Sequence, residues 1–178
     1  MKFKEICESY GGRYQYVDDE IHCRVDTIDA LKELAKYRGQ RDINRMKLIP
    51  IYEEKVLGGE YKKISIVDGD IYAYGYMTVW TGEALKEELE EKGVEDAQDV
   101  AIEILNKLNQ EEFKLNYGCK AHYDWDRDLI SVICSIHTRM RDGKTIDEVY
   151  NELEKMLERA EDEVMVKIGK LENEVLKR

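Results

Sequence analysis

The tightest constraint in this sequence is a two-residue turn, Asp68-Gly69, between two runs of alternating side chains. Asp-Gly favours the positive φ angles of a type I′ turn, which joins two antiparallel strands and fixes their register. Because successive side chains of a strand point to opposite faces, each run divides into an apolar and an aromatic set. The apolar face is predicted to carry Ile64, Ile66, Ile71, Ala73, Met77 and Val79. The other face is predicted to carry Tyr61, Tyr72, Tyr74, Tyr76 and Trp80.

Two more hairpins are predicted, over residues 13–25 with a turn at Asp18-Asp19 and over 113–140 with a loop at 125–128. The segments between and after these hairpins have helical patterns. Thr27 begins one helix, residues 83–111 form two helices separated at Gly93, and Thr145 with Glu148 forms a capping box for a helix that runs almost to the C-terminus. Residues 48–52 look like a strand, but proline cannot donate to a ladder, so Pro50 predicts an edge strand or an irregularity.

These patterns predict an α+β fold in which antiparallel hairpins form one or two sheets packed against helices, with a long C-terminal helix. The chain of 178 residues is predicted to form a single domain, 1–178, with possible sub-structure at 1–81 and 82–178. Hydrophobic residues make up 43% of the chain, which excludes a disordered protein.

Composition also bears on location. No run approaches the roughly 20 apolar residues that span a bilayer, and Glu5 interrupts the N-terminus where a signal peptide would be apolar. We therefore predict a cytoplasmic protein with no membrane association. Its four cysteines are too few and too scattered for a disulfide scaffold and are expected to be reduced. The abundance of Lys and Glu leans toward a thermophile's charge usage.

Two Cys-x-x-His pairs, Cys119 with His122 and Cys134 with His137, resemble zinc-ligand spacing. The predicted hairpin opposes Cys119 to Cys134, Ala121 to Val132, Tyr117 to Ile136 and Phe113 to Met140. A separation of three residues in a strand puts cysteine and histidine on opposite faces, so a zinc site is disfavoured. Two buried thiols in cross-strand contact are the main interpretation, and a disulfide between them remains open.

Other motifs in the sequence give only weak evidence for a metal or catalytic site. Asp124, Asp126 and Asp128 alternate like the first ligands of a calcium loop, but the glycine and the glutamate that such a loop needs are missing, which favours a solvated acidic turn with at most a weak cation site. A third motif is formed by Asp42 followed by Glu53, Glu54 and Lys55. Its spacing loosely matches the D, E-x-K pattern of a family of metal-dependent nucleases. No cofactor is predicted.

The aromatic face of the Asp68-Gly69 hairpin is the strongest candidate for binding. Tyr74-Gly75-Tyr76-Met77 matches the middle of the RNP1 pattern of RNA-recognition domains, but Tyr72 stands at its basic position and Val79 at its last aromatic one, and the order of elements differs, so no family is assigned. Phosphate contacts could come from the basic residues nearby, which are Arg38, Arg41, Arg45, Lys47, Lys62 and Lys63. The net charge of −11 opposes polyanion binding, and the alternative is that the tyrosines pack beneath a helix.

The C-terminal helix carries an apolar stripe that ends with Val164, Ile168, Leu171, Val175 and Leu176. At about 1.5 Å per residue, a helix over 146–177 is about 48 Å long. A compact chain of this size is only about 40 Å across, so the last turns are expected to overhang. A second copy could cover the stripe, which predicts a homodimer.

Taken together, these patterns predict a non-enzymatic binding or adaptor module that acts as a homodimer. The first alternative is a nucleic-acid-binding protein that uses the aromatic face and the basic segment, and the second is a metal-dependent hydrolase or nuclease. A further protein partner is compatible with the first interpretation.

Overall fold

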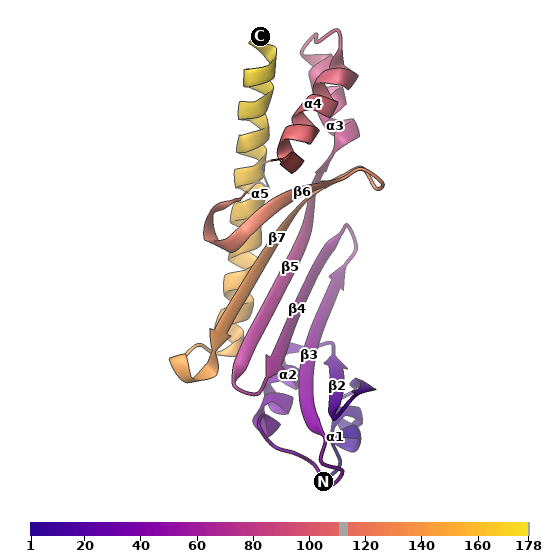
Figure 1. Ribbon diagram of the computed structural model, residues 1–178, viewed down its shortest axis with the longest axis vertical. Coiled ribbons are helices and arrows are strands. Elements are labelled where there is room, and N and C mark those ends of the chain that lie inside the picture. The colour runs from indigo at the N-terminus through magenta and orange to yellow at the C-terminus, as the bar shows by residue number, and fades with distance from the viewer. Residues whose placement is uncertain (111–113, 178) are drawn as a thin grey trace. The chain divides into compact units, whose positions relative to one another are not determined.

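The computed structural model describes residues 1–110 and 114–177. Its fold is α+β, as predicted, with one mixed seven-stranded sheet in the order β1-β2-β3-β4-β5-β7-β6 (Figure 1). The strands are β1 (Arg13–Val17), β2 (Glu20–Val25), β3 (Lys47–Val56), β4 (Glu60–Val67), β5 (Asp70–Thr81), β6 (Cys119–Asp124) and β7 (Leu129–Arg139). The helices are α1 (Phe3–Ser9), α2 (Ile28–Leu34), α3 (Gly82–Glu91), α4 (Ala97–Gln110) and α5 (Ile146–Leu176), with short 3-10 turns η1 (Ala35–Tyr37), η2 (Asn116–Gly118) and η3 (Met140–Asp142).

The chain folds as two compact units, each assembled from distant parts of the sequence. Unit 1 comprises residues 1–57, 61–75 and 135–153, and unit 2 comprises residues 58–60, 76–134 and 154–178. Strands β4, β5 and β7 and helix α5 therefore contribute residues to both units. The predicted aromatic face is divided accordingly, with Tyr61, Tyr72 and Tyr74 in unit 1 and with Tyr76 and Trp80 in unit 2.

In unit 1, β1 and β2 form the predicted antiparallel hairpin, while β2 and β3 are parallel and place Cys23 opposite Pro50. Strand β3 lies between β2 and β4, so the first alternative predicted from Pro50, an edge strand, is wrong, while the second, an irregularity in the strand, stays a prediction. A strand residue directs its amide to only one neighbour, and an interior strand can therefore lose one ladder bond at a proline and keep the rest of its pairing.

A disulfide joins Cys7 of α1 to Cys23 of β2, and both residues are fully buried. The prediction that the cysteines are reduced is therefore wrong in this structure. Sequence spacing could not show that α1 packs on β2 and brings the two sulfur atoms together. Gly12 fits beside the bond because it has no side chain: a Cβ there would lie 2.5 Å from Cys23 Sγ.

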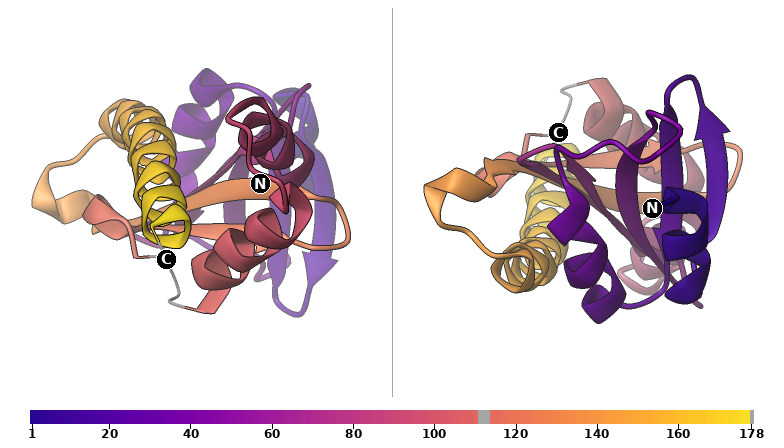
Figure 2. Two further views of the ribbon diagram at one scale, coloured as in Figure 1. Left: turned by 90° about the horizontal axis from the view of Figure 1, so that it is seen from above. Right: turned by 90° about the horizontal axis from the view of Figure 1, so that it is seen from below.

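Helix α2 and the first turns of α5 cover one face of the unit 1 strands (Figures 1 and 2). Lys32 of α2 pairs with Asp147 of α5 at 2.8 Å, which confirms that the two helices are neighbours. The predicted apolar residues of the Asp68-Gly69 hairpin point to this side and are buried in unit 1, namely Ile64, Ile66, Ile71 and Ala73. The turn lies where it was predicted, between β4 and β5. Asp68 has a φ of 53°, but Gly69 does not have the positive φ that a type I′ turn also requires there, so the predicted turn type is wrong.

In unit 2, β6 and β7 pair in the predicted register, with Cys119 opposite Cys134 and Ala121 opposite Val132. A disulfide joins the two cysteines, so the alternative that the sequence left open is the one that the structure contains. The hairpin is shorter than predicted, because β6 begins only at Cys119 and η2 precedes it. Tyr117 adopts a φ of 63° and does not oppose Ile136. The predicted partner of Met140, Phe113, lies outside the described residues.

The starts and ends of helices α3 and α5 agree with their sequence signals. Gly93, at a φ of 80°, follows the end of α3, and the α5 helix begins after Thr145, whose Oγ1 accepts the Glu148 amide at 3.1 Å. Lys92, just after α3, donates to Glu172 of α5 at 2.8 Å.

The apolar stripe of α5 is mostly buried, whereas its last turns were predicted to overhang and to be exposed. Val164, Ile168, Leu171 and Val175 are buried within the single chain, and of the predicted dimer residues only Leu176 is exposed. A second copy is therefore not needed to cover the first four, and the premise of the dimer prediction is wrong for them. Dimerisation itself stays a prediction. Among the described residues, no helix combines the length and the apolar composition needed to cross a membrane.

Candidate binding face

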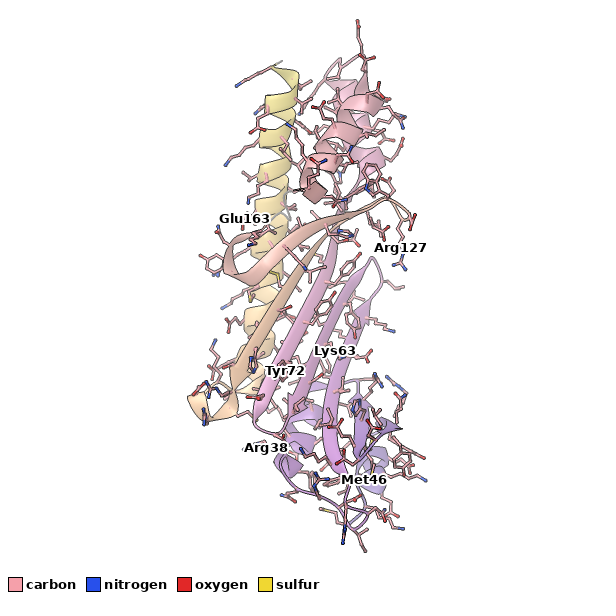
Figure 3. All side chains as sticks on the ribbon, viewed as in Figure 1. Arg38, Met46, Lys63, Tyr72, Arg127 and Glu163 are labelled. Atoms are coloured by element: carbon pink, nitrogen blue, oxygen red, sulfur yellow. A yellow bond between two sulfur atoms is a disulfide. The ribbon has the colours of Figure 1, made fainter. Side chains whose placement is uncertain are left out.

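The uncovered face of the unit 1 sheet is the candidate site. We call it the open face and define it by seven side chains of β4, β5 and β7, which are Tyr61, Lys63, Ser65, Tyr72, Tyr74, Ser135 and His137. All but Tyr61 border a shallow hollow of about 420 Å³. Figure 3 shows Lys63 and Tyr72 among these side chains, on the side opposite to α2 and α5.

Aromatic rings dominate the open face. Tyr72 is 44% exposed and Tyr74 is 37% exposed, which contradicts the alternative that these tyrosines pack beneath a helix. The Tyr72 ring stacks on the His137 ring, with centroids 4.4 Å apart and planes within 2°. Tyr61 meets Tyr74 edge to face at 6.1 Å. The rings are thus held in place by their neighbours while part of each remains accessible, as a stacking platform requires.

A short polar chain steadies the Tyr61 end of this face. Arg24 of β2 donates to Glu53 of β3 at 2.6 Å. Burial, together with the nearby Glu53 carboxylate, raises the pKa of the Tyr61 hydroxyl. Tyr61 therefore keeps its proton at neutral pH and remains a hydrogen-bond donor.

The predicted basic segment is only partly available to a ligand. Arg41 pairs with Asp19 at 3.1 Å, and Lys47 pairs with Asp68 at 3.4 Å. Arg45 is exposed, and its carbonyl oxygen accepts from Arg41. The structure therefore brings Lys63 to the open face and leaves Arg41 and Lys47 in local ion pairs.

Two predicted basic residues remain. Lys62 is buried, with its ammonium group 5.3 Å from the centroid of the Tyr150 ring, so it does not reach the open face. Arg38 contributes to a second hollow of about 500 Å³ in unit 1. We call it the arginine hollow and define it by Arg38, Gly69, Asp70, Arg139, Met140 and Arg141. No local sequence pattern connects Arg139 with Arg38, which lies about a hundred residues earlier. This cluster was missed because only the tertiary fold assembles it.

Tyr76 and Trp80 belong to unit 2 and are half-buried. The Tyr76 hydroxyl accepts a hydrogen bond from Ser131 Oγ at 2.7 Å, and Ser131 is itself buried. Tyr76 therefore serves unit 2 in part as a packing residue, and the open face does not include it.

The acidic turn of unit 2 is used for local structure. Asp124 Oδ1 accepts the Asp126 amide at 2.9 Å, and Asp128 accepts the amides of Gly82 and Glu83 at 3.0 Å each. Asp128 thus caps the N-terminus of α3, where a negative charge is favourable. Within residues 1–110 and 114–177, no group of three or more His, Cys, Asp or Glu side chains is placed to hold a metal ion.

Asp42, the first residue of the nuclease-like spacing, also has a structural role. Its buried carboxylate accepts three backbone amides, from Phe3, Asn44 and Met46. Glu54 accepts from the hydroxyls of Tyr52 and Tyr150. These carboxylates are occupied by separate partners and do not form a shared catalytic centre.

The cysteine and histidine pairs separate as the alternation predicted. Cys119 and Cys134 are buried, whereas His122 and His137 are exposed. None of the comparisons, with protein-family models, curated proteins and solved structures, found a match for this chain.

Proposed function

We propose that this protein is a non-enzymatic binding module and that the open face binds single-stranded nucleic acid. The observation that carries the proposal is the exposure of Tyr72 and Tyr74 beside Lys63 and the arginine hollow. Single-stranded nucleic acids bind to proteins by stacking bases on aromatic rings and by pairing phosphates with basic side chains. The open face offers both kinds of contact.

The distribution of charge also supports this ligand. Unit 1 contains 16 basic and 17 acidic residues, whereas unit 2 contains 12 basic and 22 acidic residues. The acidity of the chain therefore belongs mainly to unit 2. A local basic patch on a nearly neutral unit can attract a polyanion that a uniformly acidic surface would repel.

The reactive side chains support a role in binding instead of catalysis. Asp42 and Asp128 hold backbone amides, and Glu54 holds two tyrosine hydroxyls. The predicted cytoplasmic location and homodimer do not enter this proposal, because the two disulfides and the buried α5 stripe give them no support.

Fluorescence anisotropy with a labelled single-stranded oligonucleotide tests the proposal. We expect binding at about 50 mM salt and progressively weaker binding as the salt concentration rises, because phosphate contacts release counterions. Replacing Tyr72 by alanine together with Tyr74 should weaken binding at least about tenfold, since stacking is worth about 1–3 kcal/mol per base.

Tyr16→Ala is the matched control, because Tyr16 is also an exposed strand tyrosine of unit 1 and lies outside the open face. It should bind like the unmodified protein. Absence of binding at low salt, or equal losses for the control and for the Tyr72→Ala, Tyr74→Ala variant, would refute the proposal and favour a protein ligand.

A further inference from the structure

We propose that the arginine hollow is a phosphate-binding subsite at one end of the open face. This inference rests on the proposed function, because it assigns a place to one phosphate group of the bound nucleic acid. The group that the hollow binds is a phosphate, which the nucleic acid can present either at its end or between two nucleotides.

Three separate segments of unit 1 build the hollow. Arg38 follows η1, Arg139 ends β7, and Arg141 lies in η3. The Met140 amide donates to the carbonyl oxygen of Gly69 at 2.8 Å and thereby fixes η3 against the β4–β5 turn. The backbone positions of Arg139 and Arg141 are therefore set by the fold, although their side chains are exposed.

The charges of the hollow favour an anion. Three arginines border it together with a single acidic residue, Asp70. Asp70 lies 3.8 Å from His137, and Arg139 lies 3.8 Å from Asp142. Both contacts are longer than a hydrogen bond, and Arg38 uses one nitrogen to donate to the Ala35 carbonyl oxygen. Because each guanidinium has five N–H donors in a planar fork, all three keep donors for phosphate oxygens.

The hollow and the open face are continuous along two neighbouring strands. Alternate residues of β5 run from Asp70 in the hollow to Tyr72 and Tyr74 on the open face, and alternate residues of β7 run from Arg139 to His137. A step of two residues along a strand is about 6.6 Å. A nucleotide whose base stacks on Tyr72 can therefore present its phosphate to the hollow.

The test compares three forms of one short single-stranded oligonucleotide, with a 5′-phosphate, with a 3′-phosphate and with hydroxyl groups at both ends. Each form is titrated against the unmodified protein and against the hollow variant, Arg139→Gln with Arg141→Gln. The matched control is Arg13→Gln with Arg127→Gln, which removes the same charge from exposed arginines outside the hollow. Circular dichroism checks that all variants are folded.

A terminal phosphate in the hollow predicts that one phosphorylated form binds the unmodified protein about tenfold more tightly, and that the hollow variant loses this preference. An internal phosphate predicts that the hollow variant binds all three forms about tenfold more weakly, while the control does not. Either result supports the subsite. If the hollow variant binds every form as tightly as the control does, the inference is wrong even though the proposed function holds.

A titration with inorganic pyrophosphate shows whether the subsite or the proposed function is wrong when a binding experiment fails. Heteronuclear NMR should show pyrophosphate shifting the resonances of Arg38, Arg139 and Arg141 in the unmodified protein. If no oligonucleotide binds but pyrophosphate does, the hollow remains an anion site and the proposed function fails. If neither binds, both are wrong.

Discussion

At the scale of single residues, Asp42 is a buried charge that stabilises the fold by accepting backbone hydrogen bonds. The carboxylate is 7% exposed and receives amides from Phe3, Asn44 and Met46. Burial alone would raise its pKa, but these backbone hydrogen bonds and the N-terminal amino group lower it, and the pKa of Asp42 lies below its usual value. The ionised carboxylate therefore ties the N-terminus of α1 to the loop before β3.

We expect Asp42→Ala to lower the free energy of unfolding by about 3 kcal/mol near neutral pH, because one buried and two partly buried amides lose their acceptor. Since the folded pKa is depressed, this stabilisation is complete above the unfolded pKa of about 4 and is lost as pH falls through the folded value. Urea unfolding of the unmodified protein and of the Asp42→Ala variant, between neutral and strongly acidic pH, measures this stabilisation.

The difference in stability between the two proteins should shrink as the solution is acidified. Asn44→Ala serves as the control, because Asn44 contributes only its backbone amide to this contact. A difference that stays constant down to about pH 2, or that is absent at neutral pH, would contradict the role assigned to Asp42.

Single residues of the candidate site were partly predictable. Tyr72 and Tyr74 were placed on one face by period-two alternation, and the structure exposes both. The arginine hollow could not be predicted, because Arg38 and Arg139 are distant in sequence and share no periodic pattern. Alternation shows which face a side chain occupies, but it does not show which loops approach that face.

Among the elements, the β6–β7 hairpin was the most predictable. Its register follows from the alternation of apolar and polar residues, because a shift by one residue would turn the apolar set to solvent. The η2 turn broke the pattern, since the left-handed backbone at Tyr117 leaves no periodic signal. The parallel pairing of β2 with β3 was also missed, because it depends on the path of the chain through α2.

The two disulfides give a prediction at the same scale. Cys7–Cys23 and Cys119–Cys134 span 16 and 15 residues. Closing a loop of about 15 residues limits the unfolded chain and contributes about 3 kcal/mol in the chain-entropy model. We expect replacement of either pair by serine to lower the unfolding free energy by about this amount.

Peptide mapping without reductant should recover both cross-linked pairs, and denaturant unfolding of each serine variant measures the loss. Adding a reductant should destabilise the unmodified protein more than either serine variant, because each variant has already lost one of the two disulfides. Four thiols that react in the unfolded, unreduced protein would show that the bonds are absent.

At the scale of the whole molecule, charge and apolar surface are unevenly distributed. Unit 2 carries most of the net charge of −11, and α5 buries Val164, Ile168, Leu171 and Val175 within the chain. The sequence predicted the length and the stripe of α5 but not what covers the stripe, because helix length alone does not show which elements pack against it. The binding proposal therefore concerns unit 1, where the aromatic and basic side chains gather.

Photo-cross-linking followed by mass spectrometry tests this central claim most directly. A single-stranded oligonucleotide that carries photoreactive bases is bound to the unmodified protein, irradiated and digested. We predict cross-links in the β5 peptide that contains Tyr72 and Tyr74, or in the β7 peptide that contains His137, and their loss in the Tyr72→Ala, Tyr74→Ala variant. Cross-links confined to unit 2, for example at the exposed Trp125, would contradict the account.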